Sequence, residues 1–342
     1  MAMTKLSLMG QDDGSGSFSG TYGTDNALFK TVFGGLVLRA YEAKRKMLPL
    51  ITSRNVTNGK AVDFSLIGPA SAFYHTPGEN ILTDNEAGGS NYLSAIKHAK
   101  ATISLNDKLL AATTVDELDN LKNDFDSRAQ LASELGRVLA DREDRLIIQA
   151  IRAATVASDR YTGEPAAGGS VQVDWYSSGS TPNTFSVISD SMVEQIFEAA
   201  SILDQGNVPA DGRYFVMHPS YKQYLTRNTT VLNSDWGGAG SYADGTAPRV
   251  AGFTILDSTN VPITNIAAEA GEQNSLHADF TRTIGVAFHS DAAACAKLGG
   301  AGGISMSTDW MPEYQAHLLV ASQVAGYGAL KREAAVLVQK EA

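Results

Sequence analysis

Apolar and polar residues alternate in two stretches near the start of the chain. In residues 60–67 every second position is apolar, namely Val62, Phe64 and Leu66, and residues 98–105 repeat this pattern. A period of two is typical of a half-buried β-strand. The segment between the two stretches is polar and contains Gly-rich turns. We therefore predict a long hairpin with a loose tip, which must rest on another part of the fold because a lone hairpin is only marginally stable in water.

Two other regions have the helical period, with an apolar residue at every third or fourth position. The first covers residues 27–47 and ends before Pro49. The second begins at Thr114 and Glu117, which match a capping box. Its apolar stripe predicts a helix of about 40 residues and roughly 60 Å, with Gly136 as the position where it could bend. We expect so long a helix to act as a spine against which a sheet packs.

The middle of the chain mixes helical and strand patterns. Ser191 and Glu194 predict the start of a capped helix, and Pro219 suits the first position of another. Apolar runs of strand length lie at 213–217, 253–256 and 283–288. Together these elements predict a compact α/β domain over residues 186–288, after a Gly/Ser/Pro-rich connection. The chain end, 304–342, contains a further apolar run at 334–338 and is expected to supply strands that return to the spine.

Composition narrows the class of protein. The 342 residues are 43% apolar and 19% charged, as in an ordinary globular protein of about two domains. The only cysteine, Cys295, excludes a disulfide framework and any site with several cysteine ligands. No signal peptide and no stretch of about 20 apolar residues occurs, so we expect no membrane contact and use in a reducing cytoplasm.

Charge is unevenly distributed along the chain. The formal net charge of −10 argues against a dedicated nucleic-acid-binding protein. Residues 1–60 nevertheless hold eight basic and four acidic residues, whereas residues 61–120 hold three basic and eight acidic residues. A basic arm is therefore followed by an acidic segment.

The basic run of the arm consists of Arg39, Lys44, Arg45 and Lys46. It can be a solvated helix face, or it can contact an acidic protein surface such as residues 61–120 of another copy. The second interpretation would allow charge to steer self-association.

Candidate catalytic or metal-binding residues do not form a recognisable motif. The six histidines are scattered, with no two within four positions of each other. Glu143 and Asp144 are interpreted as part of a solvated helix face, and Cys295 as a small buried residue. The sequence therefore predicts no enzyme activity, no metal site and no cofactor.

The order of these parts resembles the major capsid protein of tailed double-stranded DNA phages. Residues 27–38 (ALFKTVFGGLVL) and 73–80 (FYHTPGEN) are similar to the short-tailed podophage branch, and further similarity runs through 98–110 and 252–262. The resemblance implies an α+β phage major-capsid fold with an N-terminal arm, an extended hairpin loop, a spine-helix peripheral domain and an α/β axial domain. The corresponding parts are the lead and arm at 1–50, the extended loop at 51–112, the spine helix and connection at 113–185, the axial domain at 186–288 and the return to the peripheral domain at 289–342.

The same resemblance implies a structural function. Copies would assemble as hexamers and pentamers into an icosahedral shell around phage DNA, located in the virion and assembled in the cytoplasm of a bacterial host. Expected partners are other copies, a scaffolding protein, a portal protein, and packaged double-stranded DNA by weak non-specific contact. With about 26 residues before the arm, no fused scaffolding segment is expected. We predict inter-subunit contacts at Arg39, Lys44, Arg45, Lys46, Pro77, Gly78 and Glu79.

Two alternatives to a phage shell remain open from the sequence. An encapsulin-like shell would share the fold but enclose a protein cargo. A cytoplasmic enzyme would assemble its site from distant acidic residues and histidines.

Overall fold

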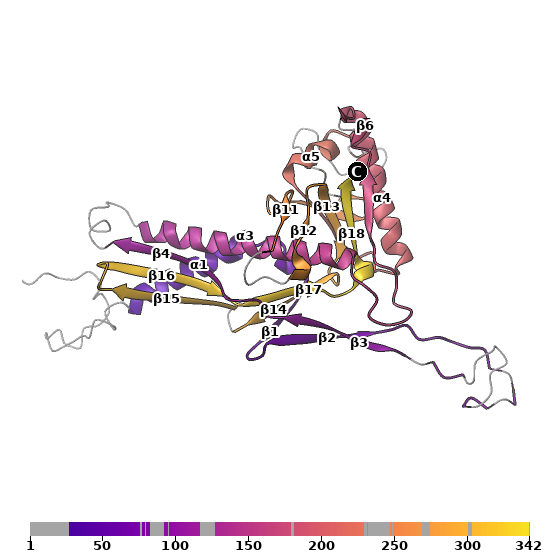
Figure 1. Cartoon of the computed structure of the whole chain (residues 1–342), viewed down its shortest axis with the longest axis horizontal. Coiled ribbons are helices and arrows are strands. Elements are labelled where there is room, and N and C mark those ends of the chain that lie inside the picture. The colour runs from indigo at the N-terminus through magenta and orange to yellow at the C-terminus, as the bar shows by residue number, and fades with distance from the viewer. Residues whose placement is uncertain are drawn as a thin grey trace, which may run out of the picture.

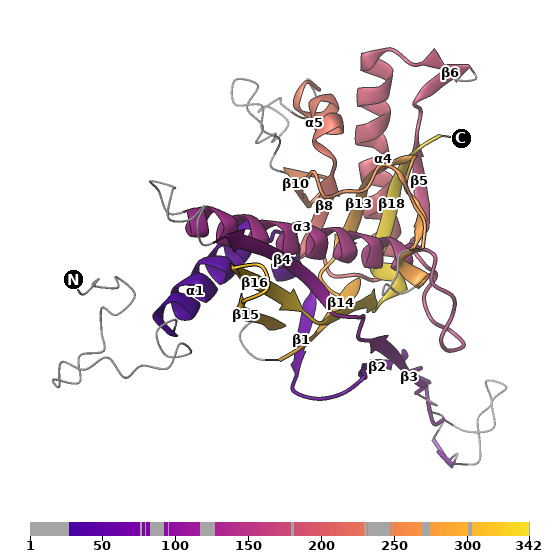
Figure 2. The same cartoon turned by 60° about the vertical axis from the view of Figure 1, so that its left-hand side comes forward.

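The computed structural model describes residues 27–341 except 76, 79, 83–91, 95, 117–126, 179–180, 229–230, 232–246, 248, 269–273 and 300–302. The molecule is elongated, and its parts are joined along one long helix (Figure 1). An α/β lobe stands on one side of this helix. A narrow three-stranded sheet extends toward one end, and a hairpin points away at the opposite end, as the turned view in Figure 2 also shows.

The long helix is α3, Ser127–Thr155. Its apolar stripe is buried, with Leu139, Ile147 and Ile151 at most 1% exposed. α3 packs against strands of three different sheets, so its burial joins them into one body. The predicted spine helix is therefore confirmed as an element, although its 29 residues are fewer than the predicted number of about 40.

The predicted start of the spine helix is wrong. Thr114 and Asp116 lie in strand β4, Leu109–Asp116, so Thr114 does not cap a helix. β4 pairs along its whole length with β16, Ala316–Gln323. The β-branched residues Thr113, Thr114 and Val115 favour this extended, half-buried conformation over a capping turn.

The predicted bend at Gly136 is also absent, because this glycine serves a helix crossing instead. α1, Ala27–Lys44, packs against α3 at this position. A Cβ atom at Gly136 would lie 2.5 Å from the carbonyl oxygen of Val37 and 3.0 Å from the Cβ of Ala40. The absence of a side chain at Gly136 thus lets the two helices approach closely.

The lobe is built on a six-stranded mixed sheet with the order β5-β18-β13-β8-β10-β9. β13, Thr283–His289, is buried along its whole length, as expected for a strand covered on both faces. Helix α4, Phe185–Gln205, packs against this sheet, and α5, Pro219–Thr226, begins at the predicted proline. The other strands are β5 Ser170–Val173, β8 Arg213–Met217, β9 Arg249–Val250, β10 Phe253–Asp257 and β18 Ala335–Lys340.

The helix predicted to open at Ser191 exists, but its predicted start is wrong. α4 begins at Phe185, and Ser191 lies buried within it. The Ser191 hydroxyl accepts a hydrogen bond from the backbone N–H of Asp174, at 3.0 Å. The Ser191 side chain therefore holds the backbone directly after residues 170–173 against α4, and it does not cap a helix.

The remaining strands form the base of the molecule and its two extensions. The base is a three-stranded sheet with the order β1-β14-β17; one extension is a second three-stranded sheet with the order β15-β16-β4, and the other is the hairpin of β2 and β3. The predicted hairpin is confirmed as an antiparallel pair in which Val62 lies opposite Ile103. The bounds are β1 Thr52–Val56, β2 Ala61–Ile67, β3 His98–Ser104, β14 Ala293–Leu298, β15 Ile304–Met311 and β17 Ala325–Ala329.

Short elements complete the described part of the chain. The strand pairs are β6 Tyr176–Ser178 with β7 Thr181–Pro182, and β11 Asn265–Ile266 with β12 Ala278–Asp279; the 3₁₀ turns are Leu48–Leu50, Asn274–Leu276 and Arg332–Ala334.

This mixture of helices and largely separate sheets is the predicted α+β class. The division into domains by residue range stays a prediction. The six-stranded sheet takes β5 and β18 from outside residues 186–288, and β18 also packs against α3. Among the described residues, no helix is both long and apolar enough to cross a membrane.

Gly136→Ala tests the helix crossing. The added methyl group meets the backbone of α1, so we expect the free energy of unfolding to fall by about 1–3 kcal/mol, although alanine favours helix more than glycine does. The measurement is chemical denaturation followed by circular dichroism. Gly35→Ala is the matched control, because a Cβ atom at this exposed position of α1 meets no atom within 4 Å. The control should be stabilised, and equal destabilisation of both variants would contradict the proposed role of Gly136.

Candidate interaction surfaces

A buried polar network holds the arm helix α1 on the body. Glu143 of α3 and Lys297 of β14 form an ion pair at 2.6 Å, and both side chains are at most 2% exposed. The Tyr41 hydroxyl of α1 donates to Glu143 and accepts from Lys297 at 2.6 Å. Burial and the charge of Glu143 raise the pKa of Tyr41 well above its usual range, so the phenol keeps the proton that it donates. Three distant segments of the chain are thereby joined through one carboxylate.

Asp144 is the second buried carboxylate at this junction. It accepts hydrogen bonds from the backbone N–H groups of Lys46, at 3.1 Å, and Met47, at 3.0 Å, directly after α1 ends. Burial raises the pKa of Asp144 to about 6, although these two hydrogen bonds oppose the increase. The interpretation of Glu143 and Asp144 as a solvated face is therefore wrong, because both are fully buried. The sequence gives little indication that Glu143 and Asp144 are buried, since Arg142 and Arg145 beside them on the same helix suggest an exposed face.

The basic run of the arm is divided by the structure. Arg45 stacks on the Tyr41 ring, with its guanidinium 5.4 Å from the ring centre, and the Lys46 amine donates to the carbonyl of Asp257 at 3.2 Å. Arg39 and Lys44 are exposed, and neither forms an ion pair with a described residue. Within one copy, Arg39 and Lys44 are therefore the two cations of the run whose side chains contact neither a ring nor a hydrogen-bond acceptor of the described residues.

The hairpin lies at the opposite end of the molecule from the free end of the β15-β16-β4 sheet (Figure 1). Its root is anchored, because Val62, Leu66 and Ile103 pack against Ala294 and Leu330 of the body. Beyond the root it leaves large apolar side chains exposed, and the Tyr74 ring is fully so. These side chains are Ile67, Phe73, Tyr74, Ile81, Leu82, Leu93 and Ile96.

The predicted contact residues of the tip are only partly described. Pro77 and Gly78 are exposed, and Gly78 adopts a φ of 100°, a conformation that favours glycine. Glu79 lies outside the described residues. Within one copy the tip and the basic residues of α1 lie far apart on the elongated molecule, so the structure does not bring the two predicted sets together (Figure 1).

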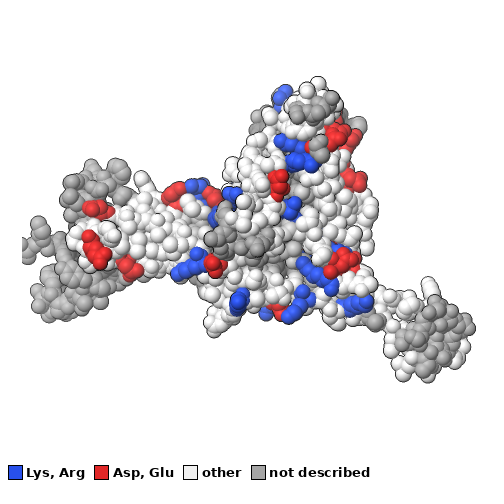
Figure 3. Space-filling model, in the orientation of Figure 1, with Lys and Arg blue, Asp and Glu red and all other residues white. Residues whose placement is uncertain are grey.

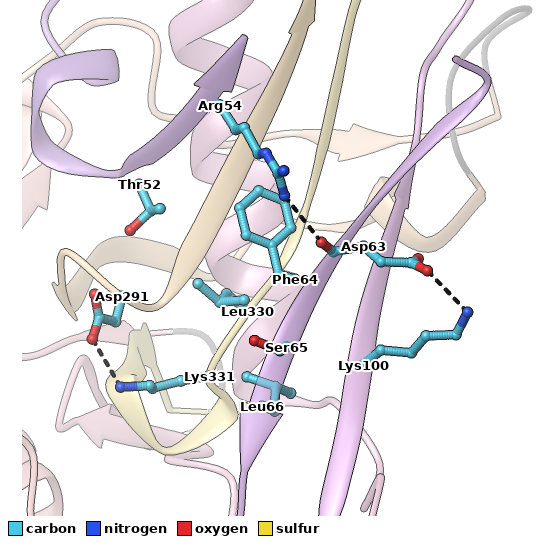
Figure 4. A pocket seen from close by; sticks show the side chains of 10 residues that line it. All are labelled: Thr52, Arg54, Asp63, Phe64, Ser65, Leu66, Lys100, Asp291, Leu330 and Lys331. Carbon is cyan, nitrogen blue, oxygen red and sulfur yellow. Dashed lines mark hydrogen bonds and ion pairs between the residues drawn. The ribbon is translucent and has the colours of Figure 1, made fainter. Parts of the chain in front are cut away.

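A cleft of about 440 Å³ lies at the root of the hairpin (Figure 4). Two ion pairs flank its apolar floor of Phe64, Leu66 and Leu330: Lys100 with Asp63 at 2.9 Å, and Lys331 with Asp291 at 2.8 Å. Hydrogen bonds from Thr102 and Lys100 lower the pKa of Asp63. The first pair joins the two strands of the hairpin, and the second lies within the body. Each of these carboxylates already has a cation, so neither is a free acid or base in this cleft.

Potential catalytic and metal-binding groups are dispersed over the described residues. No three side chains of histidine, cysteine, aspartate or glutamate in this part of the chain are placed to hold a metal ion. Cys295 is buried as predicted, and burial raises the pKa of its thiol to about 12. Figure 3 shows acidic and basic side chains interspersed over the lobe and base, while the left-hand part shows few charged side chains on this face, and those near its end are acidic.

Comparisons with known proteins point to one family. A family model described as Gp10A-like major capsid protein matches residues 64–339. The chain is 25% identical to the major capsid protein of Escherichia phage T7, covering 98% of this chain and 97% of the relative. The capsid structure of the cyanophage P-SCSP1u is 32% identical with a TM-score of 0.72, covering 85% of this chain and 86% of that one. The mature capsid of bacteriophage PhiM1, at 14% identity and a TM-score of 0.69 over 86% and 87% of the two chains, shares the fold.

Asp144→Asn tests the buried carboxylate. Because folding raises this pKa from 3.8 to about 6, the native state binds the proton more tightly, and this contribution to stability is lost as the pH rises from about 4 to 6. We expect the free energy of unfolding of the variant, relative to the unsubstituted protein, to increase by about 3 kcal/mol between pH 4 and pH 7. Denaturant titrations across this range measure it. Asp63→Asn is the control. Because the Asp63 pKa is lowered in the folded protein, the free energy of unfolding of this variant, relative to the unsubstituted protein, should decrease as the pH rises. A difference for Asp144→Asn that does not change with pH would refute the buried titration.

Proposed function

Because this chain belongs to the Gp10A-like major capsid protein family, we propose that its copies assemble as hexamers and pentamers into the icosahedral shell that encloses phage DNA. As in its relatives, the chain is a structural protein of the virion capsid and forms a shell by self-assembly. The observation that carries the finer proposal is the exposed apolar surface of the hairpin, which a single copy leaves in water. Apolar patches of this kind mark contacts between proteins.

The parts of the molecule suit different positions in such a shell. We assign the hairpin, with its tip at Pro77, Gly78 and Glu79, to an extended loop that lies on a neighbouring copy. The lobe around the six-stranded sheet is assigned to the axial domain at the centre of each capsomer. α3 and the sheets of the base are assigned to the peripheral domain, with α1 as the arm.

The arm is proposed to supply the electrostatic part of the contact. Arg39 and Lys44 are exposed cations, and the hairpin segment between β2 and β3 contains three acidic residues, Glu79, Asp84 and Glu86, before the next base. Opposite charges on two copies would steer their association and fix its register. Arg45 and Lys46, which are engaged within the copy, would act by positioning the end of α1.

Other partners follow from the role of a phage shell. We propose a scaffolding protein during assembly in the cytoplasm of the bacterial host, a portal protein in the completed shell, and weak non-specific contact with packaged double-stranded DNA. The net charge of −10 supports weak DNA contact, because a strongly acidic protein repels phosphate. An encapsulin-like cargo shell and an enzyme are not favoured, since the related chains are phage capsid proteins.

Charge reversal of the arm tests the electrostatic contact. The variant Arg39→Glu/Lys44→Glu should fold with an unchanged melting temperature, because neither side chain is buried, and should reduce the yield of closed shells at least tenfold. Sedimentation and negative-stain microscopy measure that yield. Lys60→Glu/Lys108→Glu is the matched control, since it changes the net charge equally at two exposed positions outside α1. Normal assembly of the arm variant would overturn the proposed contact.

Removing the exposed aromatic ring of the hairpin tests the apolar contact. Tyr74→Ser should leave the melting temperature of an isolated copy unchanged, because the ring is fully exposed there. It should weaken the assembled shell, since a buried interface tyrosine contributes about 2 kcal/mol or more. Denaturant-induced shell dissociation, followed by light scattering, measures the effect. Tyr74→Phe keeps the ring and should behave like the unsubstituted protein; equal shell stability for the serine variant would rule out the contact.

A further inference from the structure

The outer side of β15 is a long strand edge near one end of the molecule. β15 pairs with β16 over eight residues without a register shift. Among the described residues, no strand pairs with the other side of β15. β4, at the opposite edge of the same sheet, packs against α3. β15 therefore presents a row of backbone N–H and C=O groups that a further strand can use.

Strand edges in proteins usually carry features that prevent such addition, including charges, proline and short length. In the six-stranded sheet the edge strands β5 and β9 have four and two residues. In the hairpin, β2 carries Asp63 and β3 carries Lys100. β15 has eight residues, no proline and no basic residue, and Asp309 is its single charge. The longest of these edges is thus the least protected.

We propose that β15 pairs antiparallel with β15 of a second copy across a two-fold axis, which joins two three-stranded sheets into one six-stranded sheet. The inference rests on the shell-forming function, because it needs contacts between identical copies. Pairing of a strand with itself about a two-fold axis is self-complementary, so one surface suffices for both partners. The backbone supplies the hydrogen bonds, and the side chains set the register.

The two faces of β15 restrict that register. Ile304 and Met306 pack against the core between α1, α3 and the sheet, whereas Ser305, Ser307 and Asp309 are exposed. Residues directly opposite each other in an antiparallel pair lie on the same face of the sheet. A shift by one residue would turn the apolar side chains of one copy to the polar face of the other. Even-numbered residues must therefore lie opposite even-numbered residues.

Two registers satisfy this condition over nearly the whole strand, with either Ser307 or Thr308 on the axis. With Ser307 on the axis, Ile304 lies opposite Trp310 of the second copy, and this partly exposed indole gains apolar contact. Both registers keep Asp309 away from Asp309 of the second copy. The next register would place these two carboxylates opposite each other, which is destabilising.

A second copy of β15 fits this edge better than the start of a neighbouring chain does. Residues 10–26 are rich in glycine, serine and aspartate, which are poorly suited to strands. The strands β15, β16 and β4 carry only two charged side chains, Asp309 and Asp116, so two copies of this sheet can approach without strong repulsion.

Disulfide trapping in shells of the full-length protein tests the proposal. Ser307→Cys would place two thiols directly opposite each other when Ser307 is on the axis, within the Cα separation that a disulfide needs. The double variant Ser307→Cys/Asp309→Cys would also form a disulfide when Thr308 is on the axis, through Cys pairs between positions 307 and 309. The native Cys295 is buried and does not compete for the oxidant.

Ser305→Cys is the matched control on the same strand and the same face. In both registers its two copies are at least four residues apart along the strands, about 14 Å, which is too far for a disulfide. Shells are oxidised with diamide and dissociated, and the fraction of dimer is read on a non-reducing gel.

We expect most of the protein to run as dimer for the double variant and almost none for Ser305→Cys. Dimer from Ser307→Cys alone identifies the first register, and its absence with dimer from the double variant identifies the second. Absence of dimer from both, in shells that microscopy shows to be closed, overturns the β15 pairing while the shell-forming function stands. Equal dimer from Ser305→Cys also overturns the pairing. Failure of the unsubstituted protein to form shells would instead count against the proposed function.

Discussion

The ion pair between Glu143 and Lys297 is the interaction on which the rest of the arrangement depends. Its two charges come from the middle of α3 and from β14, and the Tyr41 hydroxyl of α1 completes it. Leaving one buried charge of such a pair without its partner costs about 3–5 kcal/mol. The arm, the spine and the base sheet must therefore be assembled together, because displacing any of them leaves a buried charge or phenol unsatisfied. Asp144 strengthens the same junction by fixing the backbone where α1 ends.

This junction fixes the orientation of two extensions, the hairpin and the β15-β16-β4 sheet, neither of which would be stable without the body. The hairpin is rooted in an apolar cluster, and the Lys100–Asp63 ion pair joins its two strands, yet it exposes large apolar side chains beyond that root. The β15-β16-β4 sheet is covered by α1 and α3 on one face and ends at β15, whose outer edge pairs with no other strand in the described part of the chain. The hairpin therefore exposes apolar side chains at one end of the spine, and β15 exposes a strand edge at the other. Surfaces at two opposite ends allow one subunit to contact several neighbours in a shell.

Local patterns were sufficient where one periodicity dominated a segment. The alternation around Val62 and Phe64 identified the hairpin, and the apolar stripe through Leu139 identified the spine. Local sequence patterns predicted the wrong start for two helices, because tertiary contacts engage the residues that could otherwise cap them. Thr114 matches a capping box, but eight pairs with β16 place it in a strand. Ser191 has a hydroxyl that could cap a helix, but it lies six residues after the start of α4. Its hydroxyl instead accepts a hydrogen bond from the backbone N–H of Asp174.

The sequence by itself determined the class of fold, the main helices and strands, and a resemblance to phage shell proteins, because these depend on periodicity and on runs of neighbouring residues. Only the tertiary structure decided how the charged residues are used. Glu143 and Asp144 resemble exposed residues until α1 covers them, and Arg45 and Lys46 resemble free cations until Tyr41 and Asp257 engage them. Gly136 resembles a flexible point until Val37 is placed beside it. Apart from Tyr41, which lies only four positions from Arg45, each partner lies about a hundred residues or more away, and local pattern carries no information about contacts at that separation.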